Sequence, residues 1–271
     1  LYAPFSVTLD TIQQVQCFGE CNAMVQLTTT GAVSPYTYSW SNGQTYLGPG
    51  LDTAFNLCWG GHSVIIQDAY GCDTTILFTI DEPAELLTWG QSIQPVQCYG
   101  ADDGIAYAIG IGGAGTYTYS WSTYPYDSTL IYTNNDTVNN LTPGIHTVGI
   151  SDTNGCTAFD TVLITEPTQL VVEIIDSLAV YSYCIGTNSG QLCAVASGGT
   201  PGYSYAWNNS TQLTACAVNL SAGQYTVSVI DDRSCVASDS FDLDSITNSM
   251  LASNFDFNIN HISCNGLYDG S

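Results

Sequence analysis

The sequence predicts an all-β protein made of tandem antiparallel β-sandwiches, and three observations support this prediction. Apolar and polar residues alternate with a period of two, which is the spacing of a strand that buries one face. Gly, Asn, Asp and Pro interrupt these runs about every ten residues, as in folds built from many short strands. A pattern of tyrosine, tryptophan and cysteine returns about every 80 residues, which indicates a repeat. No stretch supports a helix of any length.

A tyrosine–tryptophan strand marks each copy of the repeat. It reads YTYSW at 36–40, YTYSW again at 117–121 and YSYAW at 203–207. Because alternate residues of a strand share one face, the two tyrosines and the tryptophan of each copy are expected to face the same way. A tryptophan in this position packs between the two sheets of an immunoglobulin-like sandwich. We therefore interpret the strand as core rather than as a displayed binding element.

The other strands are predicted from the same period. Runs rich in β-branched residues lie at 23–29 and 73–80. Tyr225 follows a Gly-x sequence that resembles the tyrosine corner of sandwich domains, and His62 and His146 take its position in the other copies. We interpret both histidines as structural rather than metal-binding or catalytic. In two strands the period assigns the inward residues, which are His62, Val64 and Ile66 in the first copy and Tyr225, Val227 and Val229 in the third.

Cysteines recur at the same interval. Opening cysteines stand in Cys-x-Gly sequences early in each copy, and closing cysteines follow a turn that begins with Asp. After two closing cysteines an apolar run ends at Glu82-Pro83 or Glu166-Pro167, and proline stiffens such a short joint. The opening cysteines are Cys17, Cys98, Cys184 and Cys264, and the closing cysteines are Cys72, Cys156 and Cys235. We predict immunoglobulin-like repeats of about 80 residues, with short linkers, at 1–83, 84–167 and 168–247, the start of a fourth at 248–271, and an array that continues beyond Ser271.

The simplest disulfide arrangement pairs each opening cysteine with the closing cysteine of its own repeat. Such a bridge closes a loop of roughly 50 residues or more, which stabilises by about 4 kcal/mol in the chain-entropy model. The further cysteines are even in number within the first and third repeats, so each of these repeats is expected to form a second bridge. A zinc site is the alternative, but Cys17 and Cys21 have no matching second pair. The predicted bridges are Cys17–Cys72, Cys21–Cys58, Cys98–Cys156, Cys184–Cys235 and Cys193–Cys216, with Cys264 bonded to a residue beyond the segment.

The composition indicates an extracellular location. Eleven cysteines are typical of an oxidising compartment. With 24 acidic residues against one Lys or Arg, the formal net charge is −23, so binding to nucleic acid or to an anionic membrane surface is disfavoured. No segment has the apolar length of a membrane span, so direct membrane insertion is not expected.

Candidate catalytic groups are few, and we expect neither enzyme activity nor a cofactor. Carboxylate pairs at Asp102-Asp103 and Asp231-Asp232 lie in apparent turns and at no constant position of the repeat, whereas general acid–base catalysis needs convergent groups. Calcium is the more plausible ligand because it takes oxygen ligands. Its weak candidates near the joints are Asp68, Asp81, Glu82, Asp152 and Glu166.

The combined pattern of Cys-Phe/Tyr-Gly, Tyr-x-Tyr-x-Trp, Asp-x-x-Gly-Cys and Glu-Pro resembles the SprB-type repeat of giant surface adhesins in gliding, type IX-secreting, Bacteroidetes-like bacteria. The resemblance covers essentially the whole chain, although the third copy has DDRSC as its closing turn and lacks Glu-Pro. It implies a non-catalytic segment of a long secreted cell-surface filament for surface attachment and gliding motility. External surfaces or polysaccharide are the implied partners, and type IX secretion and the gliding machinery would act through other parts of the chain.

The resemblance also implies a modification. Bacteria of that group O-glycosylate Ser or Thr that follows Asp and precedes a small or aliphatic residue. Chance matches in a β protein rich in Asp and Thr are the alternative. The candidates are Thr11, Thr53, Thr74, Ser128, Thr137, Thr161, Ser177 and Ser245.

Two alternatives to an adhesin remain at this point. One is an array of carbohydrate-binding modules, in which exposed aromatic residues stack on sugars. The other is a spacer in a large secreted enzyme whose catalytic domain lies elsewhere. A glycan array tests the first alternative, and the mass of the natural chain tests the second. The aromatic candidates are Trp59, Trp89, Tyr124 and Tyr126.

Overall fold

The computed structural model describes residues 4–122, 135–176, 188–208 and 210–244, and it contains no α-helix among them. The predicted all-β class is confirmed. The chain divides into two compact units, of which the first holds residues 1–93, 105–139 and 144–163 and the second holds residues 94–104, 140–143 and 164–271. The repeat boundaries at the two Glu-Pro joints remain predictions, and the predicted fourth repeat lies outside the described residues.

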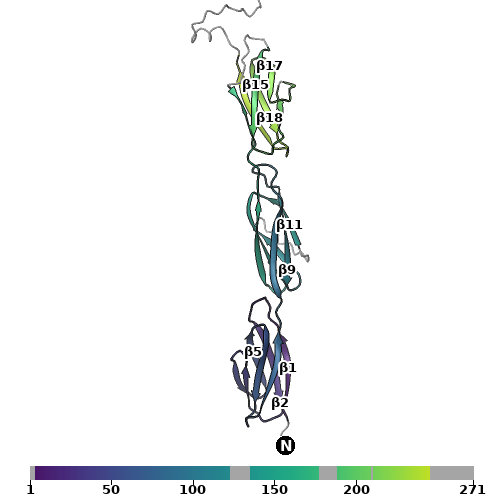
Figure 1. Ribbon diagram of the computed structural model, residues 1–271, viewed down its shortest axis with the longest axis vertical. Helices are drawn as coiled ribbons and strands as arrows, with labels where there is room; N and C mark the ends of the chain where they lie inside the picture. Colours follow the sequence, from purple (N-terminus) through teal and green to yellow (C-terminus); the bar gives the residue numbers. More distant parts are fainter. Residues whose placement is uncertain (1–3, 123–134, 177–187, 209, 245–271) are drawn as a thin grey trace, which may run out of the picture. The chain divides into compact units, whose positions relative to one another are not determined.

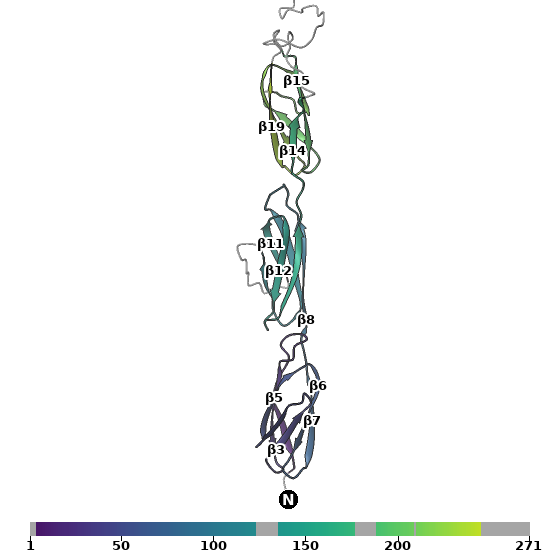
Figure 2. The same cartoon turned by 90° about the vertical axis from the view of Figure 1, so that its left-hand side faces the viewer.

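The first unit begins with a sandwich of seven antiparallel strands (Figure 1). Its sheets have the strand orders β1-β2-β5 and β4-β3-β6-β7, and Figure 2 shows β5 on one side and β6 and β7 on the other. Residues of both sheets form one buried core, in which Leu27 belongs to the first sheet and Ile66 to the second. The strands are β1 (Ser6–Gln13), β2 (Ala23–Thr30), β3 (Tyr36–Trp40), β4 (Thr45–Gly48), β5 (Leu51–Leu57), β6 (Gly60–Gln67) and β7 (Asp73–Ile80).

The next six described strands form a second pair of sheets, with the orders β11-β9-β8 and β10-β12-β13. The two sheets meet closely at Gly110 of β9, where an added Cβ would lie 2.8 Å from the Tyr117 ring and 3.1 Å from Ile150 of β12. Glycine at this position therefore lets the sheets approach. The strands are β8 (Ala84–Gln94), β9 (Gly104–Gly113), β10 (Thr118–Trp121), β11 (Asn135–Leu141), β12 (Gly144–Ser151) and β13 (Thr157–Ile164).

The second unit holds the third pair of sheets, with the orders β14-β15-β17 and β16-β18-β19. Leu192 of β15 and Val227 of β18 are completely buried in the core that the two sheets share. The strands are β14 (Val171–Ile174), β15 (Gly190–Ser197), β16 (Ser204–Trp207), β17 (Cys216–Leu220), β18 (Gly223–Ile230) and β19 (Val236–Leu243).

The tyrosine–tryptophan strand faces the core in every copy, as its period predicts, and in the third copy Tyr203 and Tyr205 are partly buried against that core. Along β3 buried and exposed residues alternate strictly, and the three tryptophans are each at most 5 % exposed. Each indole N–H is satisfied by an acceptor: Trp40 donates to Asp52 Oδ2 at 2.7 Å, Trp121 to Asp136 Oδ2 at 3.0 Å, and Trp207 to the Thr214 carbonyl at 3.0 Å. The first tyrosine of each motif donates its hydroxyl to a glycine carbonyl five residues earlier: Tyr36 to Gly31, Tyr117 to Gly112 at 2.7 Å, and Tyr203 to Gly198 at 2.6 Å.

The histidine at the tyrosine-corner position has the structural role predicted for it. The Tyr225 hydroxyl donates to the Ser221 carbonyl at 3.0 Å, and His62 Nε2 lies 2.9 Å from the Cys58 carbonyl, also four residues earlier. The ring of His62 also stacks on Phe78 at 5.8 Å. Since a carbonyl only accepts, Nε2 of His62 carries the proton. His146 is buried at the matching position of β12.

Candidate functional site

Two loops of each sandwich carry the recurring cysteines. We call residues 14–22 and 95–103 the opening loops, each of which joins the first two strands of its sandwich. We call residues 68–72, 152–156 and 231–235 the closing turns, each of which joins the last two. These loops and turns form the candidate functional site because their sequences recur most closely outside the core.

The aspartate that begins each closing turn organises it. Its Oδ1 accepts hydrogen bonds from the backbone N–H groups two and four residues later: Asp68 from Tyr70 and Cys72, both at 2.9 Å, Asp152 from Asn154 and Cys156, both at 2.9 Å, and Asp231 from Arg233 at 2.9 Å and Cys235 at 2.8 Å. The residue before the cysteine is left-handed, with φ of 84° at Gly71 and 85° at Gly155. Ser234 adopts the same conformation at 70°, so the glycine missing from DDRSC does not change the turn.

Asp231 is ionised in its turn. Burial opposes its charge, but backbone N–H donors, among them Thr200 at 2.8 Å from Oδ2, and the positive charge of Arg233 outweigh burial. The pKa of Asp231 therefore lies below its ordinary value.

The glutamate of each Glu-Pro joint is hydrogen-bonded to the glycine of a Cys-x-Gly motif. Gly19 and Gly100 have φ of 76° and 73°, a conformation that favours glycine. The Gly19 N–H donates to Glu82 Oε2 at 2.9 Å, and the Gly100 N–H donates to Glu166 Oε2 at 2.9 Å. In each case a glutamate after the last strand of the sandwich holds its opening loop.

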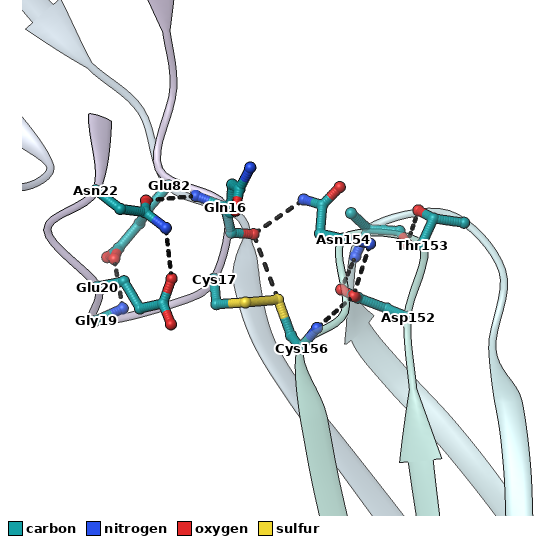
Figure 3. Close-up of a disulfide and its surroundings, with 11 residues drawn as sticks. Gln16, Cys17, Gly19, Glu20, Asn22, Glu82, Asp152, Thr153, Asn154 and Cys156 are labelled. Atoms are coloured by element: carbon teal, nitrogen blue, oxygen red, sulfur yellow. Dashed lines mark hydrogen bonds between the residues drawn. A yellow bond between two sulfur atoms is a disulfide. The ribbon is translucent and has the colours of Figure 1, made fainter. Parts of the chain in front are cut away.

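Each described opening loop is bonded to a closing turn of the following sandwich. Cys17 forms a disulfide with Cys156, and Cys98 forms one with Cys235, both with a Cα–Cα distance of 5.6 Å. Figure 3 shows the first bond, where Asn154 Nδ2 donates to the Gln16 carbonyl at 2.9 Å and Cys156 Sγ lies 3.4 Å from the same oxygen. At the second bond Arg233 Nη1 donates to the Val96 carbonyl at 3.3 Å, and Cys235 Sγ lies 3.5 Å from the Gln97 carbonyl. Both bonds therefore form within the same kind of contact.

The predicted bridge Cys184–Cys235 is wrong because Cys235 is bonded to Cys98. The predicted bridges Cys17–Cys72 and Cys98–Cys156 are also wrong, because the opening loop and the closing turn of each of these two sandwiches lie at opposite ends of it. The Val15 N–H of the first opening loop donates to the carbonyl of Asp81, just after β7, whereas the closing turn lies before β7. Eight strand residues separate these ends by about 27 Å, far beyond the Cα–Cα limit of about 7 Å for a disulfide. The same applies to the second sandwich, where Val96 bonds to Thr165 just after β13.

The second bridges of the first and third repeats are formed as expected. Cys21 is bonded to Cys58, and Cys193 is bonded to Cys216, its direct cross-strand neighbour between β15 and β17. Cys72 is exposed and free, while Cys184 and Cys264 lie outside the described residues.

The weak calcium candidates have other partners. Asp68 and Asp152 accept the N–H bonds of their turns, and Glu82 and Glu166 hold the opening loops, so the carboxylates of four of the five candidates are already hydrogen-bonded. Among the described parts of the chain, no group of three or more His, Cys, Asp or Glu side chains is arranged to hold a metal ion.

The modification and sugar-stacking candidates are spread over the sandwiches. Thr11, Thr137 and Thr161 are exposed, and Thr53 and Thr74 are half-buried. Trp59 follows β5 and is 62 % exposed, and Trp89 lies in β8 and is 57 % exposed. Ser128, Ser177, Ser245, Tyr124 and Tyr126 lie outside the described residues.

Comparison with known proteins supports the sequence-based family prediction. The family described as SprB repeat matches residues 9–45 and 180–212, stretches that run from near an opening cysteine to the tyrosine–tryptophan strand. The resemblance to the SprB repeat is thus confirmed at these two stretches, and it supports a cell-surface adhesin repeat. No curated protein matches the chain. No helix in the described residues is long and apolar enough to cross a membrane.

The chain is also similar, at low identity, to several solved structures. Three N-terminal domains of the outer capsid protein Hoc of bacteriophage RB49 are 16 % identical, with a TM-score of 0.35, over 90 % of this chain and 100 % of that chain. Invasin, a bacterial integrin-binding protein, is 12 % identical, with a TM-score of 0.35, over 90 % of this chain and 60 % of that chain. A C-terminal fragment of intimin is 12 % identical, with a TM-score of 0.33, over 68 % of this chain and 69 % of that chain. Likenesses this distant say nothing about what the chain binds.

Proposed function

We propose that the chain is a non-catalytic segment of a long secreted adhesin filament at the cell surface, which serves surface attachment and gliding motility. The observation that carries the proposal is the pair of disulfides between successive sandwiches, Cys17–Cys156 and Cys98–Cys235, in a chain that matches the SprB repeat. An enzyme needs convergent reactive groups, whereas covalent bonds between successive modules suit a chain that transmits tension.

In this proposal the repeats at 1–83, 84–167 and 168–247, with a fourth that begins at 248–271, are spacers that resist unfolding. The net charge of −23 repels neighbouring filaments and keeps them apart. External surfaces or polysaccharide are the partners, and type IX secretion and the gliding machinery act on other parts of the natural chain.

Fluorescent antibody against this segment tests the proposal on living source cells. Spots that travel along the cell and propel antibody-coated beads are expected. Fixed spots would remove the motility role and leave static attachment, while an absence of surface staining on intact cells would overturn the filament itself.

O-glycosylation is part of the proposal, because three candidates, Thr11, Thr137 and Thr161, are exposed. Mass spectrometry of the natural protein is expected to find glycan additions at these threonines. Unmodified peptides at all three positions would contradict it.

A carbohydrate-binding role is the second candidate, favoured by the exposure of Trp59 and Trp89. If these rings stack on sugars, Trp59→Ala or Trp89→Ala abolishes a signal on a glycan array. Phe159→Ala is the matched control because Phe159 is 70 % exposed and lies outside the aromatic candidates. An array without any signal for the unaltered chain would exclude this role.

A further inference from the structure

The three closing turns have the same backbone geometry. In each turn the N–H of the first aspartate donates to the carbonyl of the cysteine four residues later, at 2.9 Å for Asp68, 3.0 Å for Asp152 and 3.0 Å for Asp231. The cysteine N–H returns a bond to the carboxylate in all three. Cys72 is therefore held in the same turn as the two cysteines that are bonded to opening loops.

The two bonded turns show what the turn binds. Each is bonded to a loop with a Gln-Cys-aromatic-Gly sequence, QCFG with Cys17 or QCYG with Cys98. The cysteines of the two turns, Cys156 and Cys235, are only 9 % and 8 % exposed. The residue two positions before the cysteine, Asn154 or Arg233, donates to a carbonyl of that loop. A closing turn thus binds an opening loop twice in one chain, each time through a disulfide and a hydrogen bond from a side-chain N–H group.

The first turn differs in that its cysteine is exposed. Cys72 is free, and Tyr70, at the position of Asn154 and Arg233, is 67 % exposed. Neither described opening cysteine is available to Cys72, since Cys17 and Cys98 are already bonded.

We infer that Cys72 is a disulfide site for the opening loop of a further repeat of this kind, a loop with the sequence Gln-Cys-aromatic-Gly. The loop docks on the 68–72 turn, next to Cys72. This inference goes beyond the adhesive role and does not depend on it.

The bond forms by thiol–disulfide exchange with the disulfide of an oxidoreductase in an oxidising compartment. The thiolate of Cys72 attacks that disulfide, and one oxidoreductase thiolate leaves. The thiolate of the opening loop then attacks the Cys72 sulfur of the mixed disulfide, and the second oxidoreductase thiolate leaves. Two protein thiols lose two protons and two electrons in total, and one oxidoreductase disulfide becomes two thiols.

Disulfide mapping of the natural full-length protein tests the inference. Cells are treated with N-ethylmaleimide to block free thiols, and the protein is digested without reduction. The Cys72 peptide is expected to be joined to a peptide with a Cys-aromatic-Gly sequence. Alkylated Cys72, or Cys72 joined to glutathione or to a different sequence, would overturn the inference.

Two further measurements sharpen the test. Non-reducing electrophoresis separates the sources of the loop, because a loop from the same chain leaves a monomer whereas a loop from a second copy gives a multimer that reduction dissolves. In cells that make Cys72→Ser, one opening-loop thiol becomes open to alkylation. The matched control Cys21→Ser exposes Cys58 instead. If Cys72→Ser frees no additional thiol, the inference is wrong.

Discussion

Glu82 accepts a hydrogen bond of 2.9 Å from the backbone N–H of Gly19, a residue 63 positions earlier in the chain. Glu166 and Gly100 repeat this relationship in the second sandwich, also at 2.9 Å. A glutamate of the joint thereby fixes the loop that carries the opening cysteine, and it places that cysteine for its bond with the next closing turn.

Glu82→Ala is expected to lower the free energy of unfolding of the first sandwich by about 1 kcal/mol, because a charge-assisted hydrogen bond at an exposed site is lost. Urea denaturation followed by tryptophan fluorescence measures the change. Glu85→Ala is the control, since it removes a nearby exposed carboxylate, whereas the Gly19 N–H donates to Glu82. If both substitutions lowered the free energy of unfolding equally, the loss would come from removing a negative charge and not from the hydrogen bond to Gly19.

Reduction is expected to lengthen the chain that unfolds under force. With both disulfides intact, the shortest covalent path from Cys17 to Cys235 crosses the two bonds and the backbone from 98 to 156, about 200 Å when extended. After reduction the whole backbone between these cysteines extends, to about 760 Å. Single-molecule pulling with and without dithiothreitol compares the two lengths.

A variant with Cys21→Ser and Cys58→Ser serves as the control for that measurement. Its disulfide does not lie on the shortest path, so both extended lengths should stay the same. Equal lengths with and without reductant in the unaltered chain would contradict the bonds between sandwiches.

The two tyrosines of the second motif are expected to differ in their response to loss of the hydroxyl. Tyr117→Phe removes a bond of 2.7 Å to the Gly112 carbonyl and should cost about 1 kcal/mol. The hydroxyl of Tyr119 is buried beside the backbone of Gly110 without a well-formed hydrogen bond, so Tyr119→Phe should be neutral or stabilising. Denaturant midpoints of the two variants provide the comparison, and a larger loss for Tyr119→Phe would refute this reading of the core.

Alkaline pH is expected to destabilise the second sandwich through Tyr119. Burial raises the pKa of Tyr119 from 10.0 to about 12. Between these values the unfolded chain releases the proton and the folded chain keeps it, so the free energy of unfolding falls as pH rises. Tyr119→Phe should show a smaller fall between pH 10 and pH 12, and an unchanged fall would contradict this prediction.

Acidic pH is expected to lower the free energy of unfolding through Asp231. Its pKa is depressed in the folded chain, so its contribution is present above the ordinary value of 3.8 and is lost as pH falls through the lower folded value. At neutral pH Asp231→Asn should cost about 2 kcal/mol, because an acceptor of three backbone N–H groups loses its charge. Asp232→Asn, at an exposed position, is the control in urea titrations.

The strands and the core could be predicted because the hydrophobic effect leaves a period of two in the sequence. Val64 and Ile66, assigned inward by that period, are completely buried, and the same period places Tyr38 and Trp40 in the core. The acceptors of the tryptophans could not be found in this way. Asp52 and Asp136 are buried, yet nothing in their local sequence distinguishes them from exposed aspartates.

The disulfide partners could not be predicted from intervals alone, because an interval does not tell at which end of a sandwich a loop lies. The opening loop follows the first strand and the closing turn precedes the last, and only the direction of these strands separates Cys17 from Cys72. Counting the strands of the predicted immunoglobulin-like topology would have shown that the two cysteines lie at opposite ends of the sandwich. Cys21 and Cys58 could be paired because they were the only further cysteines of their repeat.

The offset of the two bonds between sandwiches gives the chain redundancy. The stretch from Cys17 to Cys156 overlaps the stretch from Cys98 to Cys235, so every peptide bond between Cys17 and Cys235 lies inside at least one disulfide-closed ring. Cutting any one of them leaves two pieces that remain covalently joined. Bonds confined to single repeats would have left the joint between Cys72 and Cys98 as a point where one cut severs the chain. The bonds observed make that joint as durable as the modules on either side of it.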